Sequence, residues 1–130
     1  MLKGALTLKD PKYYLFFTRT ANGRRAAKAF LERLKERTSD RDSPIAIRSF
    51  RTQLKAIHAW GTQAPQDLEI ITQPTFVANG DDDLMVPTAN TVDLARRIPC
   101  AKLAIYKDAG HGGIFQHHES FVAEALAFLA

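Results

Sequence analysis

Two short apolar segments, each followed directly by a polar loop, constrain the fold of this chain more than any other feature. The first leads into Gly80-Asp81-Asp82-Asp83 and the second into Ala109-Gly110-His111-Gly112. Each apolar run is short and bounded by turn residues, which is the pattern of a buried strand. A helical pattern between the runs predicts that the two strands are parallel, and parallel strands end at the same edge of a sheet. We therefore expect Asp83 and His111, 28 residues apart, on neighbouring loops at that edge.

The residues after Gln73-Pro74 predict a β-α-β-α unit. We expect a strand at 75–79, a helix at 88–98, a strand at 101–106 and a helix at 119–129. Two parallel strands do not form a stable sheet alone, because both edges and both faces need cover. The missing neighbours have three possible sources: residues upstream, a second copy of the chain, or the segment Tyr13–Thr18.

The first part of the chain has helical rather than alternating periodicity. Apolar residues at three- and four-residue intervals predict a helix over 23–37, carried by Ala27, Phe30, Leu31 and Leu34. A second helix is expected from Ser43-Pro44, an N-cap followed by proline, to a stop at Gly61. Tyr13–Thr18 fits a strand or an extended segment packed under helices, and the sequence leaves both open.

Size and composition place the chain among globular proteins. It has 130 residues, 45% of them hydrophobic and 25% charged, and no apolar run spans a bilayer or forms a secretion signal. We expect a cytoplasmic protein without a membrane partner. Residues 1–60 carry 14 Lys and Arg against 5 Asp and Glu, and residues 61–130 carry 4 against 9. We expect no nucleic-acid partner despite the basic first half, because no binding motif or aromatic platform accompanies it.

An acid and a histidine on adjacent loops could serve proton transfer. The histidine takes a proton from a hydroxyl, and the acid holds the other ring nitrogen in the required tautomer. Asp83 and His111 have the residue types for these two roles of a Ser-His-Asp triad. The alternative is that the three aspartates form a solvated turn and His111 is an ordinary loop residue. The two motifs, in this order after two strands, favour the catalytic pairing.

The third triad residue is not readable in the sequence. No Gly-x-Ser-x-Gly motif occurs, and none of the four serines, at positions 39, 43, 49 and 120, follows an expected strand. A metal site that combines His111 with His117 and His118 lacks a recognised ligand spacing. We expect neither a metal nor a cofactor.

Residues 75–130 resemble the carboxy-terminal portion of an α/β-hydrolase, in the esterase and cofactor-free haloperoxidase-like branch. The resemblance rests on Asn79-Gly80, on Asp83 ahead of Val86-Pro87, and on the loop Asp108–Gly112. It implies that Asp83 is the triad acid and His111 the triad base. Residues 1–72 resemble the helical cap that such enzymes insert before the acid-bearing strand. The earlier strands, the oxyanion-hole loop and the nucleophile elbow of the family have no counterpart here.

The expected fold is therefore α/β, with a helical cap-like segment at 1–72 and the β-α-β-α part of an α/β-hydrolase domain at 73–130. The implied chemistry is hydrolysis of a small ester or related acyl compound. The isolated chain is expected to be inactive, because it lacks the nucleophile. Whether the chain is an enzyme at all stays open at this point. The alternative is a non-catalytic interaction module derived from a hydrolase. Either way, we expect self-association or a partner chain that completes the sheet.

Overall fold

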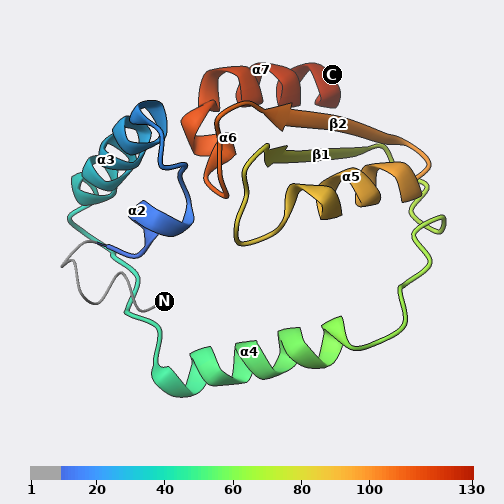
Figure 1. The fold of residues 1–130 in the computed structure, drawn as a ribbon, viewed down its shortest axis with the longest axis horizontal. Helices are drawn as coiled ribbons and strands as arrows, with labels where there is room; N and C mark the ends of the chain where they lie inside the picture. Colours follow the sequence, from blue (N-terminus) through green and yellow to red (C-terminus); the bar gives the residue numbers. More distant parts are fainter. Residues whose placement is uncertain (1–9) are drawn as a thin grey trace. The chain divides into compact units, whose positions relative to one another are not determined.

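A computed structural model describes residues 10–130 and divides them into two compact units (Figure 1). One unit contains the described residues up to Glu36 together with Leu68–Ala130, and the other is Arg37–Asp67. The first unit holds both strands and both polar loops. The second holds one helix, α4 (Ile47–Gly61), none of whose residues is buried.

The β-α-β-α prediction is confirmed. Strand β1 (Thr75–Gly80) pairs in parallel with β2 (Ala101–Tyr106), in a register that runs from Thr75 opposite Ala101 to Gly80 opposite Tyr106. Helix α5 (Thr88–Arg97) connects the two strands, and α7 (His118–Leu129) closes the chain after the single turn α6 (Gly113–Gln116). This is the part of an α/β fold that the sequence predicted.

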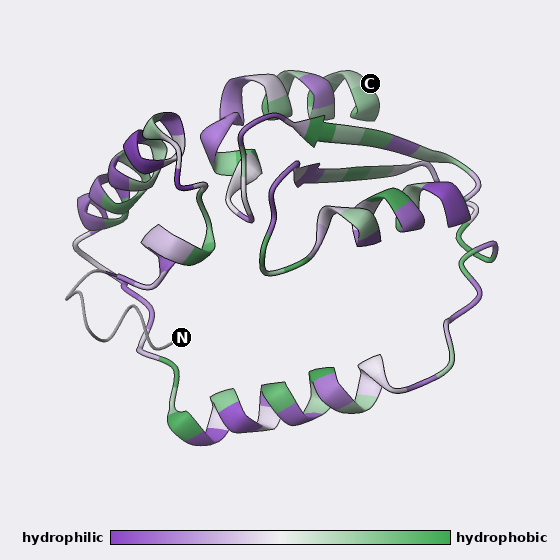
Figure 2. Ribbon diagram, in the orientation of Figure 1, coloured by the Kyte–Doolittle hydropathy of each residue, from purple (hydrophilic) through white to green (hydrophobic). Residues whose placement is uncertain are grey.

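The two faces of the sheet are covered by different helices, as Figure 1 shows. Phe76 on β1 stacks against Phe121 and Phe128 of α7, with ring centroids 6.0 and 5.6 Å apart. Successive strand residues point to opposite faces, and Asn79 accordingly reaches Thr91 of α5. In Figure 2 the strands are largely hydrophobic, whereas the loops that follow them contain hydrophilic segments. The polar groups therefore collect at the carboxyl ends of the strands.

The segment 13–18 forms neither a strand nor an extended segment, so both sequence interpretations are wrong. Helix α2 (Lys12–Leu15) is a single turn that begins where the Asp10 carboxylate accepts the Lys12 N–H at 2.9 Å. Proline at position 11 suits such a start, because its fixed φ matches the helix. An irregular loop follows, in which Phe17 is only 4% exposed.

The two long helices differ slightly from the sequence prediction at their starts. Helix α3 (Ala21–Glu36) begins two residues early, because the Thr20 hydroxyl accepts the Gly23 N–H at 3.0 Å and caps it. Helix α4 begins at Ile47 rather than at Pro44, with Ala46 in an extended conformation at its cap. No Ser43 side-chain bond caps it, so the Ser-Pro signal was wrong about the start. It ends at Gly61, as expected.

Candidate active site

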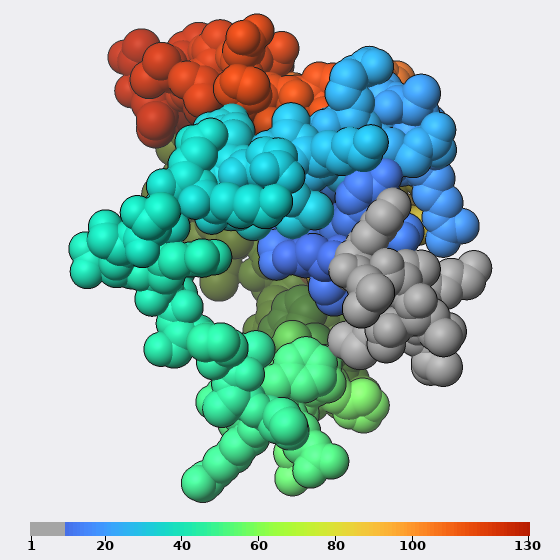
Figure 3. Space-filling model, turned by 90° about the vertical axis from the view of Figure 1, so that its left-hand side faces the viewer, coloured from blue at the N-terminus to red at the C-terminus, as the bar shows by residue number. Residues whose placement is uncertain are grey.

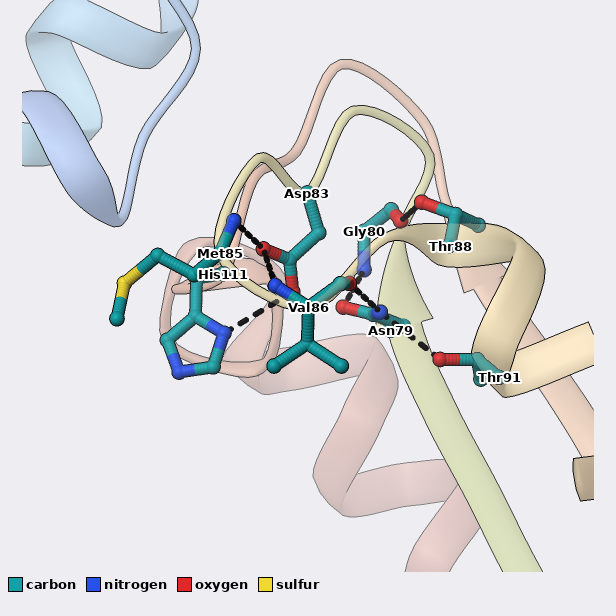
Figure 4. Close-up of polar contacts among 8 residues, drawn as sticks. All are labelled: Asn79, Gly80, Asp83, Met85, Val86, Thr88, Thr91 and His111. Atoms are coloured by element: carbon teal, nitrogen blue, oxygen red, sulfur yellow. Dashed lines mark hydrogen bonds and ion pairs between the residues drawn. The ribbon is translucent and has the colours of Figure 1, made fainter. Parts of the chain in front are cut away.

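The loop after β1 is shaped by side chains that bond its backbone. The Asn79 side chain accepts the Gly80 N–H at 2.8 Å and donates to the Val86 carbonyl at 3.2 Å. The Thr88 hydroxyl, at the start of α5, donates to the Gly80 carbonyl at 2.7 Å. Both ends of the loop are thereby fixed to the strand, as Figure 4 shows.

Asp83 lies at the centre of this loop, and its side chain is only 1% exposed. One carboxylate oxygen accepts the N–H groups of Met85 and Val86, at 2.8 and 3.0 Å. The other oxygen lies 3.0 Å from Nδ1 of His111 (Figure 4). The structure therefore brings the two predicted site residues into direct contact.

The surroundings of Asp83 favour its charged form. Burial by itself disfavours a carboxylate, but the hydrogen bonds from Val86, His111 and Met85 outweigh that effect and hold the pKa of Asp83 below its ordinary value. An ionised Asp83 can only accept a hydrogen bond, so a neutral His111 must carry its proton on Nδ1. The lone pair of Nε2 is then free to accept a proton.

His111 presents Nε2 to a cleft rather than to another side chain. Within residues 10–130, the ring of His111 has a single hydrogen-bond partner, Asp83. The ring is about one-third exposed, and none of the four serine hydroxyls bonds to it. The cleft beside it has a volume of ≈ 400 Å³, and it is lined by Phe16, Ala78, Asn79, Asp83, Val86, Thr91, His111, Gly113, Ile114 and Phe115. This lining contains no lysine or arginine.

Asp81 and Asp82 connect the two loops, in addition to forming the turn expected of them. The Asp81 carboxylate accepts the Ala109 N–H at 3.3 Å, and the Asp82 N–H donates to the Ala109 carbonyl at 2.9 Å. Gly80 allows this approach, since a Cβ at that position would lie 2.1 Å from the Ala109 carbonyl oxygen. The loops that carry Asp83 and His111 are therefore joined through their backbones.

Sequence reasoning missed the residues that support the pair. The Asn79 side chain donates to the Thr91 hydroxyl and to the Val86 carbonyl, and the Thr88 hydroxyl donates to the Gly80 carbonyl, so these side chains fix the loop that carries Asp83. The Asn79-Gly80 pair at the end of a strand is a sequence signal for such a role, because an Asn side chain readily bonds the backbone of a turn. In the part of the chain that the structure describes, no group of three His, Cys, Asp or Glu side chains could hold a metal ion.

Comparison with known proteins agrees with this architecture. The alpha/beta hydrolase fold family matches residues 4–118, so the chain belongs to that family. A solved structure from Chitinophaga pinensis, described as an alpha/beta hydrolase fold protein, superposes with a TM-score of 0.87 at 36% identity. The superposition covers 98% of this chain and 48% of that one.

Two curated relatives match shorter stretches. RutD of Caulobacter sp. strain K31 is 36% identical over 80 residues, which are 62% of this chain and 29% of RutD. A non-heme haloperoxidase of Rhodococcus erythropolis is 33% identical over 69 residues, 52% of this chain and 25% of that protein. The chain thus matches less than a third of each curated relative and about half of the solved structure.

No helix among residues 10–130 has the length and apolar character needed to cross a bilayer.

Proposed function

We propose that this chain is the carboxy-terminal portion of a serine hydrolase that acts on ester or related acyl bonds. The observation that carries the proposal is the contact of 3.0 Å between Asp83 and Nδ1 of His111, with Nε2 directed to a cleft. In this function, residues 1–72 form the cap-like segment and residues 73–130 carry the acid and the base. The small substrate would be a neutral ester or a chemically related compound.

In the proposed reaction His111 acts first as a base and then as an acid, and Asp83 supports it in both steps. Nε2 of His111 removes the proton of a serine hydroxyl as the serine oxygen attacks the acyl carbon. His111 then donates that proton to the leaving group, and Asp83 stabilises the imidazolium formed between the two steps. The serine and the oxyanion-hole donors come from residues outside these 130, so the chain alone has little or no turnover.

A chimera tests the proposal. The part of the Chitinophaga pinensis protein that lies outside the matched 48% is joined to this chain, and hydrolysis of a p-nitrophenyl ester is measured. We expect turnover by the chimera, and a loss of about 10³-fold or more in kcat when His111 is changed to Ala, because removal of a triad histidine can cost up to about 10⁶-fold in kcat. His118→Ala is the matched control, because His118 is exposed and its ring lies within hydrogen-bond distance of the Phe115 carbonyl. Undiminished turnover of the His111→Ala chimera would refute the role of His111.

A non-catalytic module is the second candidate function. It is favoured by the sheet, which has only two strands among the described residues, and by the absence of a serine beside His111. In that case the chain would complete its sheet by self-association, and the chimera would hydrolyse the ester no faster than its His111→Ala variant.

A further inference from the structure

The loop between α2 and α3 lies directly against the loop that carries His111. The Gly112 N–H donates to the Phe16 carbonyl at 2.6 Å. The Phe16 ring meets the His111 imidazole edge to face, with centroids 5.2 Å apart and planes at 64°. Figure 3 shows the surface of α3, which follows this loop, adjoining that of the carboxy-terminal region. The ring of the candidate base therefore packs against a residue 95 positions earlier in the chain.

Asp108 holds this contact together from the other side of the loop. Its carboxylate accepts the Thr18 hydroxyl at 2.8 Å and the Thr20 hydroxyl at 2.9 Å. These bonds lower the pKa of Asp108, so it is charged at neutral pH. Its carbonyl accepts the side-chain amide of Gln116 at 2.8 Å. Asp108 thus ties Thr18 and Thr20 to the start of the His111 loop.

The backbone of Asp108 is unusual as well. Its φ is 52°, in the left-handed region that favours glycine and, to a lesser degree, Asp and Asn. An aspartate at a position whose φ favours glycine needs a compensating interaction. The two threonine hydroxyls supply one.

The glycines that flank His111 are accounted for by the same contact. A Cβ on Gly110 would lie 2.8 Å from the Phe16 carbonyl oxygen, and one on Gly112 would lie 3.1 Å from it. Glycine at these two positions lets the Phe16 backbone approach the loop closely. The loop around His111 is therefore shaped to receive the segment Phe16–Thr20.

We propose that Asp108 is a positioning residue for His111, which it keeps aligned by holding the segment Phe16–Thr20 against the catalytic loop. The inference rests on the proposed function, in which His111 is the base. Among residues 10–130 the imidazole has one hydrogen-bond partner, Asp83, and a ring held by one bond can still turn about its side-chain torsions. Phe16 limits that rotation on one side, and Asp108 keeps Phe16 in place. Small losses of alignment at a catalytic group are known to be costly.

Nitrogen-15 NMR of the imidazole in the full chain tests the inference without a need for activity. The measured quantities are the fraction of His111 protonated on Nδ1 and the exchange rate of that proton with water. Asp108→Gly removes the carboxylate but keeps the positive φ favourable. We expect exchange about tenfold faster and a smaller Nδ1-protonated fraction, the change expected for the loss of one or two ordinary hydrogen bonds. Asp108→Asn tolerates positive φ and still accepts hydrogen bonds, so its exchange rate and its Nδ1-protonated fraction should stay close to those of the parent chain.

The control and the second variant keep the test decisive. Asp40, in the unit 37–67, is the other non-glycine residue with positive φ in the described chain, so Asp40→Gly makes the same backbone change in the unit that does not contain His111. If Asp108→Gly unfolds the chain, Thr18→Val takes its place, because it removes the 2.8 Å bond without altering Asp108. The inference is overturned if the folded Asp108→Gly chain, or Thr18→Val in its stead, leaves His111 as in the parent chain.

A different variant tests the proposed function separately from the role of Asp108. In Asp83→Asn the side-chain carbonyl still accepts the Met85 and Val86 N–H groups, which leaves the NH2 group, a donor, facing Nδ1 of His111. This variant must therefore abolish the preference for the Nδ1-protonated tautomer if Asp83 and His111 act as a pair. An unchanged tautomer in Asp83→Asn refutes the pair itself. A changed tautomer in Asp83→Asn together with an unchanged one in Asp108→Gly refutes only the positioning role of Asp108.

Discussion

At the scale of single residues, the two carboxylate oxygens of Asp83 have different partners. One oxygen closes the turn through the N–H groups of Met85 and Val86, and the other faces His111. The turn bonds keep a nearly fully buried carboxylate charged, and the charge is what holds the imidazole in the tautomer that leaves Nε2 free. The same hydrogen bonds therefore contribute to the stability of the loop and to the state of the candidate base.

This coupling predicts a pH-dependent contribution of Asp83 to stability. Its pKa is lower in the folded chain than in the unfolded chain, so the contribution is complete above the ordinary aspartate value of 3.8 and is lost as the pH falls through the folded value. Asp83→Asn should therefore lower the free energy of unfolding by about 2 kcal/mol near neutral pH, the typical strength of hydrogen bonds to a charged group.

Urea unfolding followed by circular dichroism, near neutral pH and in strong acid, measures this contribution of Asp83 to stability. Comparison of variant with parent at each pH isolates Asp83 from the other aspartates that titrate. In strong acid the stability difference between parent and Asp83→Asn should shrink. A difference that grows as the pH falls below the ordinary aspartate value would show that the sign of the pKa shift is wrong.

At the scale of elements, the sequence predicted those parts whose patterns are local. Strands β1 and β2 and helices α5 and α7 were located to within one or two residues, because each combines its own periodicity with clear turn residues at its ends. The contact between Asp83 and His111 followed from the topology, since parallel strands end at one edge.

The loop 16–20 could not be predicted in the same way. It has no periodicity, and the partner of Thr18 and Thr20 is Asp108, which lies 90 and 88 positions later. The direction of the Asp108 side chain depends on a positive φ that the sequence does not reveal. The start of α4 was misplaced for the opposite reason, because a local signal at Ser43-Pro44 was not supported by any bond.

Helix α3 is anchored to this region by one aromatic side chain. Phe30 contacts Phe16, Phe17 and Phe115, with ring centroids 6.1, 5.5 and 5.0 Å apart. We expect Phe30→Ala to lower the free energy of unfolding by about 3 kcal/mol, in the range for removal of a large packed side chain. Phe50→Ala in α4 is the matched control and should cost much less, because no aromatic contact is found for Phe50 within residues 10–130. Equal losses for the two variants, measured by urea unfolding, would contradict the anchoring role.

At the scale of the whole molecule, one edge of β1 has no strand partner among the described residues. The N–H groups of Thr75 and Asp81 donate to carbonyls at the two ends of β2. Backbone N–H groups of successive strand residues point alternately to the two sides of the strand. The N–H of Ala78, an odd number of residues from Thr75 and Asp81, therefore points away from β2. No described strand pairs with that side of β1. Such an edge is a template for another strand.

We therefore predict that the chain self-associates through the free edge of β1. Sedimentation velocity should show a weight-average mass that rises above the 14.5 kDa of one chain as concentration increases. Ala78→Pro removes an N–H that β2 does not use, so it should keep the chain monomeric while circular dichroism stays unchanged. Val77→Pro is the contrasting variant, because it removes an N–H directed at β2 and should disrupt the sheet itself. A parent chain that stays monomeric at every concentration would exclude self-association and leave residues outside these 130, or a separate partner chain, to cover the edge.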